Sequence, residues 1–219
     1  MDGFEPTTRG IIALSVGPWA QLLDGDPVIL PADLVLPPEV SRFTLGSTDR
    51  RWRLQVGQVR ADLFLNRTTE DESLNTLEFA ETGSSVFRQL LRSSNARVTR
   101  IAFTVHRAQP MLDPAMTLAR FFCRDDIIAG PLRRAQTFEL HAHKVYSPPG
   151  MPRVNSWVRW RTAALQPSGR SAIAVEQDLN TPAEDTAGAS HGPAEINAFL
   201  HSAAREVDAI LTLYLQARL

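Results

Sequence analysis

The first part of the chain alternates between apolar and polar residues, a period of two that is typical of half-buried antiparallel strands. The alternation predicts strands over 41–46, 51–57 and 59–66, after an apolar strand over 9–16. In the strands predicted over 51–57 and 59–66, the apolar positions are Trp52, Leu54, Val56, Val59, Ala61, Leu63 and Leu65. Residues 17–38 are rich in proline and resemble a loop. A loop of that length is uncommon in a compact domain, so we expect a short helix or strand within it.

Helical spacing follows in the middle of the chain. A helix is predicted over 82–94, after a polar, acidic loop at 67–81, and a strand is predicted over 97–107. The apolar stripe of the helix consists of Val86, Phe87, Leu90 and Leu91.

A second helix is predicted to begin at Asp113 and Pro114, because Asp is a favourable N-cap residue and Pro suits the first helical position. Its apolar stripe contains Leu118, Phe121 and Phe122. We expect Cys123, the chain's one cysteine, to pack beside this stripe as a small buried hydrophobe.

The last third predicts three long strands and a long helix. The strands cover 134–146, 154–165 and 171–180, and Pro- and Gly-rich turns separate them, which indicates a meander. The helix runs from Pro193 to about 217. Its apolar stripe consists of Ile196, Phe199, Leu200, Ala203, Val207, Ile210, Leu211 and Tyr214.

This order predicts an α+β fold, in which antiparallel sheets are packed by helices and a C-terminal three-stranded meander precedes a long amphipathic helix. The 219 residues suit a single domain. Alternatively, two halves at 1–130 and 131–219 share the core. Both halves contain three strands followed by a helix, but their side-chain patterns do not match, so the sequence does not establish a repeat.

The composition is that of an ordinary soluble globular protein, with 43% apolar and 21% charged residues. No run of about 20 apolar residues is present, and the acidic start does not resemble a signal peptide, so we expect a cytoplasmic protein without a membrane anchor. A single cysteine excludes a disulfide framework. The phosphate-binding, dinucleotide-binding and nucleophilic-serine motifs are also absent, so no cofactor is predicted.

Basic residues are segregated along the chain although the net charge is −1. No acidic residue lies between Glu81 and Asp113, or between Glu139 and Glu176. The arginines of these windows include Arg88, Arg92, Arg100, Arg107, Arg159 and Arg161. They are candidates for binding nucleic acid or another anion if they meet on one face. Alternatively, acidic and basic segments neutralise each other in the folded chain.

Trp157, Arg159 and Arg161 form the best candidate recognition strip, because alternate residues of a strand share a face. An aromatic side chain beside two arginines on an open sheet can stack on bases and contact phosphates. In the alternative interpretation, Trp160 lies in the core on the opposite face, and the two arginines pair across the sheet with Glu139, Glu176 or Asp178.

Glu139, His141 and His143 share a strand face in the same way and are the candidate metal ligands or acid/base groups. Two histidines and a carboxylate can bind a metal with open coordination positions. However, side chains two apart on a strand diverge by roughly 7 Å. The alternative is a solvated polar face.

The C-terminal third also carries a resemblance. A strand opens with Arg-Ala-Gln-Thr-Phe (134–138), a Trp/Arg-rich strand follows (156–161), and a strand ending Gln-Asp-Leu-Asn-Thr (177–181) precedes the helix starting Glu-Ile-Asn-Ala-Phe-Leu (195–200). This order resembles a sporadically distributed family of uncharacterised bacterial proteins. The resemblance implies a bacterial cytoplasmic protein that works in a multi-component system. The layout also resembles, more loosely, export chaperones of the SecB type, which implies peptide binding.

Together these features favour a non-catalytic protein-interaction subunit or adaptor with a protein partner or a second copy of the chain. Nucleic-acid binding through the arginines and a metal-dependent enzyme using Glu139, His141 and His143 are the alternatives. A chaperone-like or small-ligand-binding role is the remaining one.

Overall fold

The structure, a computed structural model, describes residues 18–31, 33–69, 72–94 and 96–215, with the backbone alone described for 18 and 210–215. The strand predicted over 9–16 and the predicted burial of Ile210, Leu211 and Tyr214 therefore lie outside the described parts. The chain divides into two compact units. Unit 1 combines the residues up to Val98 with Ser190–Leu200, and unit 2 combines Thr99–Ala189 with the residues from His201 onward. Each unit contains an antiparallel sheet, so the fold class is α+β, as predicted.

Unit 1 contains a four-stranded sheet in the order β1-β2-β3-β4 and the helix α2. Its elements are the 3-10 helix η1 (Pro18–Gln21), β1 (Val28–Ile29), β2 (Phe43–Gly46), β3 (Trp52–Val56), β4 (Ala61–Leu65) and α2 (Thr76–Arg92). The three strands predicted from the alternation are confirmed within a residue or two at their ends. The short helix and strand expected within 17–38 are η1 and β1.

The helix α2 begins at Thr76, so the loop predicted over 67–81 was partly wrong. The Asn75 side chain caps the helix by accepting hydrogen bonds from the backbone N–H groups of Leu77 and Glu78, at 3.0 and 3.2 Å. Glu78 in the first turn faces the positive end of the helix dipole. The acidic residues that resembled a loop are therefore favourable at a helix start.

The core of unit 1 lies between its sheet and α2. Val86 and Leu90 of the predicted stripe are buried against strand residues that include Phe43, Trp52 and Leu54. The first turns of α5 belong to this unit and contribute three buried apolar side chains, Ile196, Phe199 and Leu200.

Unit 2 contains a four-stranded sheet in the order β5-β8-β7-β6. Its strands are β5 (Ala102–Pro110), β6 (Glu139–Tyr146), β7 (Val154–Ala164) and β8 (Ser171–Asn180), and its helices are α3 (Pro114–Phe122), α4 (Asp125–Ala129) and η2 (Ala183–Asp185). The long helix α5 (Pro193–Leu215) begins in unit 1 and continues in unit 2. The strands β6, β7 and β8 form the predicted meander before α5. Strand β5, which the division at residue 130 placed with the N-terminal half, pairs with β8.

Two strands begin later than predicted. The strand β5 starts at Ala102 instead of 97, and β6 starts at Glu139 instead of 134. Arg134 has a φ of 62°, in the left-handed region, which interrupts an extended strand.

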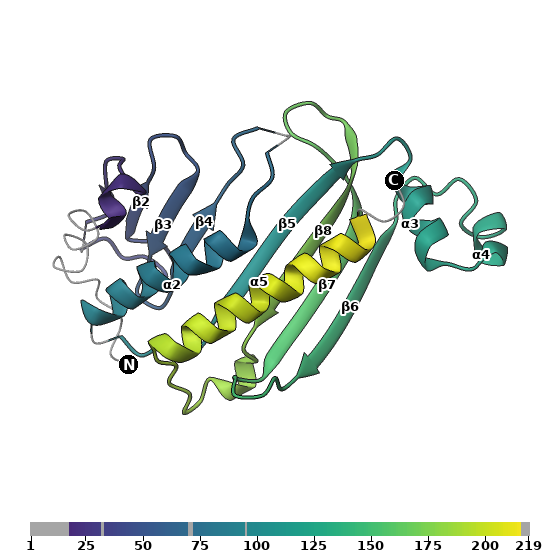
Figure 1. Cartoon of the computed structure of the whole chain (residues 1–219). Helices are drawn as coiled ribbons and strands as arrows, with labels where there is room; N and C mark the ends of the chain where they lie inside the picture. Colours follow the sequence, from purple (N-terminus) through teal and green to yellow (C-terminus); the bar gives the residue numbers. More distant parts are fainter. Residues whose placement is uncertain (1–17, 32, 70–71, 95, 216–219) are drawn as a thin grey trace. The chain divides into compact units, whose positions relative to one another are not determined.

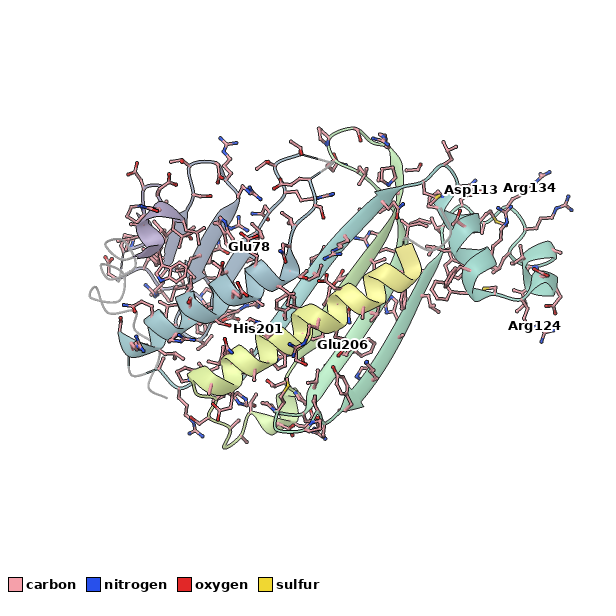
Figure 2. All side chains as sticks on the ribbon, in the orientation of Figure 1. Glu78, Asp113, Arg124, Arg134, His201 and Glu206 are labelled. Atoms are coloured by element: carbon pink, nitrogen blue, oxygen red, sulfur yellow. The ribbon has the colours of Figure 1, made fainter. Side chains whose placement is uncertain are left out.

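One face of this second sheet is covered by α5 (Figure 1). Three contacts place α5 over this face. Lys144 Nζ lies 2.8 Å from Glu206 Oε1, Arg107 Nη2 lies 3.0 Å from Asp208 Oδ1, and the Tyr146 hydroxyl bonds Glu206. Figure 2 labels Glu206 on this helix. The α5 side chains buried here are Ala203, Ala204 and Val207.

The helix α3 packs on the same face at the other end of the sheet. It begins after the predicted cap, with the Asp113 side chain accepting a hydrogen bond from the Met116 N–H. The rings of Phe122 and Trp160 lie 5.2 Å apart, which ties α3 to the covered face of β7. Phe121 of the predicted stripe is 42% exposed instead, and Cys123 is only half-buried. The last turn of α3 is therefore only partly covered.

Candidate functional site

The face of the second sheet opposite α5 and α3 carries most of the charged and polar side chains of β5 to β8. Residues that pair directly in adjacent antiparallel strands share a face, so the register defines rungs across the sheet. We call this surface the open face. It carries Thr104, His106, Glu139, His141, His143, Trp157, Arg159, Arg161, Glu176 and Asp178.

The first rung contains His106, Glu176, Arg159 and His141, with Glu139 beside them. The Glu139 Oε1 atom accepts hydrogen bonds from both His141 Nε2 and Arg159 Nε, each at 2.5 Å. These two donors hold the pKa of the Glu139 carboxyl below its ordinary value of 4.5. At the other end of the rung, His106 Nδ1 lies 3.5 Å from Glu176 Oε2.

The second rung contains Thr104, Asp178, Trp157 and His143. The imidazole of His143 stacks on the Trp157 indole with ring centroids 4.1 Å apart and an interplanar angle of 12°. Trp157 is 43% exposed although β7 is an interior strand. A large aromatic side chain exposed at the centre of a sheet is unusual unless something binds it, because its burial is worth several kcal/mol.

A chain of amide hydrogen bonds supports this aromatic pair. His143 Nε2 donates to Asn155 Oδ1 at 2.5 Å, and Asn155 Nδ2 donates to Asn180 Oδ1 at 3.1 Å. Asn180 Nδ2 donates in turn to Asp178 Oδ2 at 3.1 Å. Asn180 is buried, so its neighbours hold it in place, and the network therefore fixes the orientation of the His143 ring.

The candidate metal ligands do not converge. Glu139 and His141 form a hydrogen bond, whereas His143 is directed to Asn155 and Trp157. In the described part of the chain, no group of three or more His, Cys, Asp or Glu side chains is arranged to hold a metal ion. The shared strand face predicted from the sequence is therefore present, but the ligand geometry is not.

The candidate arginines lie on different surfaces. Arg159 and Arg161 share the open face with Trp157, and Arg100 Nη2 bonds Asn180 Oδ1 at 3.3 Å. Arg107 lies on the covered face and pairs with Asp208. Trp160 is 5% exposed on the covered face, and Arg159 pairs with Glu139 across the sheet, so the alternative interpretation of the recognition strip is confirmed for these residues.

Arg88 and Arg92 belong to unit 1. There they line an open hollow together with Pro193, Ala194 and Asn197 from the first turns of α5. The structure therefore separates them by compact unit from the arginines of the second sheet.

Sequence reasoning missed His106 and Asn155, which the register also places on the open face. His106 alternates with Thr104 along β5, which is the same signal that grouped His141 with His143. The signal could not place His106 opposite Glu176, because β5 and β8 pair over a separation of 70 residues at that rung. Three of the chain's five histidines lie on this one face.

The fold and this face define an α+β protein with one helix-covered sheet whose other face is polar and exposed. Comparison with protein-family models, with curated protein sequences and with solved structures finds no match to this chain. Among the residues described, no helix is both long and apolar enough to cross a membrane.

Proposed function

We propose that this protein is a non-catalytic interaction subunit or adaptor that binds a protein partner through the open face of its second sheet. The observation that carries the proposal is Trp157, 43% exposed at the centre of the sheet and stacked on a hydrogen-bonded histidine. Tryptophan is among the residues most enriched at binding hot spots. A rigidly held aromatic side chain also loses little conformational entropy on binding.

The surroundings of Trp157 support a protein partner. Charged and polar groups pair with one another around it, as in the polar rim that surrounds the aromatic centre of many interfaces. Glu139, Arg159 and His141 are each about 40 to 50% exposed, with side-chain values of 43, 42 and 48%. They are therefore both fixed in geometry and available to a partner.

The charge balance favours protein over nucleic acid. The open face places the carboxylates of Glu139, Glu176 and Asp178 among its arginines. These carboxylates would repel a phosphate backbone, and Glu139 already neutralises Arg159. The bacterial multi-component setting that the resemblance implies is part of this proposal.

Photo-crosslinking in the organism that encodes the chain tests the proposal. The photoreactive residue benzoylphenylalanine replaces Thr104, which lies exposed on the open face two strands from Trp157. The matched control places it at Ser168, exposed in the turn between β7 and β8. We expect a discrete protein adduct from position 104 that is absent from position 168 and disappears when Trp157→Ala is added.

An adduct that nuclease removes would move the function to nucleic acid. No adduct from position 104, or equal adducts from both positions, would refute the interaction role of the open face.

A further inference from the structure

We infer that two copies of this chain pair antiparallel through the edge strand β6, with Ala142 at the twofold axis, to form a continuous eight-stranded sheet from two four-stranded ones. The inference rests on the geometry of the strand edge and is independent of the proposed partner of the open face.

Strand β6 is a long and regular edge. Within the described residues it pairs only with β7, and its register stays constant from Glu139 to Tyr146 with no bulge. It contains neither proline nor glycine, and every residue except Leu140 and Tyr146 is exposed. Natural proteins usually protect such an edge with a bulge, a proline, charged side chains or a covering segment, because its free backbone groups are a template for strand pairing. The charged side chains of β6 are already paired within the chain, Glu139 with His141 and Arg159, and Lys144 with Glu206.

The register shows which backbone groups are free. The Thr162 N–H donates to the Phe138 carbonyl at 3.1 Å, and these residues stand directly opposite in the β6–β7 register, so they form a hydrogen-bonded pair. Hydrogen-bonded and non-hydrogen-bonded pairs alternate in an antiparallel ladder. The outward N–H and C=O groups therefore belong to Glu139, His141, His143 and Val145.

The outward residues are self-complementary about Ala142. With Ala142 on the axis, Glu139 pairs with Val145 of the second copy and His141 with His143 of the second copy. All four outward residues then face outward residues of the other copy. A register centred on His141 or on His143 leaves an outward residue at one end opposite a residue outside the strand, so it uses fewer of these groups.

The side chains permit this register. Ala142 meets its own copy at the axis, where the Cα atoms of a non-hydrogen-bonded pair approach to about 4.5 Å and a small residue is required. Half-buried Leu140 faces the apolar stem of Lys144, whose ammonium group is held by Glu206 of its own chain. A net charge of −1 per chain gives little repulsion between copies.

The same register joins the open faces. The rung that carries Trp157 and His143 in one copy continues into the rung that carries His141 and Arg159 in the other. The two Trp157 side chains then stand three strand spacings apart and offset by two residues along the strands, about 16 Å in all. The dimer thus presents two equivalent aromatic sites on one surface.

Sedimentation equilibrium on the full chain tests the dimer. Ala142→Lys places two ammonium groups at the axis, and Ala164→Lys is the control, since Ala164 is also an exposed strand alanine but lies in β7. We expect twice the chain mass for the wild type and for Ala164→Lys, and the mass of one chain for Ala142→Lys with an unchanged circular dichroism spectrum. A monomeric wild type, or a dimer that survives Ala142→Lys, would overturn the inference.

A disulfide tests the register itself. In a Cys123→Ser background, Ala142→Cys places two thiols at a Cα separation compatible with a disulfide. We expect mild oxidation to give a covalent dimer for Ala142→Cys and none for Ala164→Cys. A non-covalent dimer whose position 142 does not cross-link would refute pairing about Ala142.

Discussion

The hydroxyl of Tyr146 donates a hydrogen bond to the carboxylate of Glu206, which joins the edge strand β6 to the helix α5. Lys144 Nζ lies 2.8 Å from the other oxygen of this carboxylate and 4.6 Å from the centre of the Tyr146 ring. One glutamate therefore holds two side chains of the strand. Because Glu206 is only 19% exposed, we expect these contacts to be worth more than an ordinary surface pair.

A double-mutant cycle measures this contact. We expect Tyr146→Phe and Glu206→Gln each to lower the free energy of unfolding by about 1.5–3 kcal/mol, as is typical of hydrogen bonds to charged groups. The coupling energy between the two changes, from urea unfolding of the single and double variants, should be at least about 0.5 kcal/mol. Strictly additive effects would mean that the hydrogen bond does not contribute to stability.

Alkaline pH should weaken the same contact. Burial raises the pKa of Tyr146 above its ordinary value of 10.0, and the Glu206 carboxylate adds to this shift. The folded chain therefore holds the phenol proton more tightly than the unfolded chain. This stabilisation is complete below pH 10 and is lost as the pH rises toward the raised pKa. Between pH 9 and 11, stability should fall more steeply in the wild type than in Tyr146→Phe. Parallel curves would contradict the shift.

Phe199 is the most informative core position of α5, since it is 1% exposed and belongs to unit 1. Phe199→Ala should lower the free energy of unfolding by about 3–5 kcal/mol through lost burial and the cavity left behind. Val59→Ala, at a 65% exposed position, is the control and should cost under about 1 kcal/mol. A loss below about 1 kcal/mol for Phe199→Ala would mean that this helix face is covered by a partner instead of the chain's own core.

Trp157 and Trp160 offer a comparison within one strand, because they lie on opposite faces at 43% and 5% exposure. Trp160→Ala should cost about 3–5 kcal/mol, and Trp157→Ala about 1 kcal/mol or less. Iodide quenching gives an independent readout. Trp157→Phe should remove most of the iodide-accessible fluorescence, and Trp160→Phe should leave it nearly unchanged. The reverse result would place the open face on the wrong side of the sheet.

The cap of α2 is a small and separate test. Asn75→Ala removes the acceptor for two backbone N–H groups and should cost about 1 kcal/mol. Asn75→Asp keeps an acceptor at the same position and should retain the stability. Equal losses in both variants, measured by thermal unfolding, would show that the side-chain cap is not what starts the helix at Thr76.

The sequence predicted strands well where one face is buried and the other is not. Trp160 and Val158 alternate with Trp157 and Arg159 in burial as they do in the sequence. The predicted start of β6 was wrong because Arg134 adopts a left-handed backbone conformation, which an arginine in the sequence gives no reason to expect. The predicted start of α2 was wrong because its capping residue and its acidic first turn are polar, and such residues are equally typical of a loop.

The candidate site, like the fold, could be predicted from the sequence only in part. Residues that share one strand, such as His141 and His143, could be grouped from their spacing alone. Their partners depend on which strands pair and in which register, and the pairing of His106 with Glu176 depends on contacts between distant parts of the chain. The rotation of His143 toward Asn155, which separates it from His141, is set by side-chain packing that no spacing rule describes.

The contribution of α5 to unit 1 constrains how this chain is made and how it can be divided. Leu200 lies 3.7 Å from the position that a Cβ atom at Gly83 would occupy, so the first unit is completed by residues synthesised more than 100 positions after α2. A ribosome must release nearly the whole chain before the first core can close, and β5 must likewise wait for β8. A fragment ending at Val98 would lack part of its own core and would expose apolar surface, so the first unit cannot be cut out as a contiguous piece of the gene.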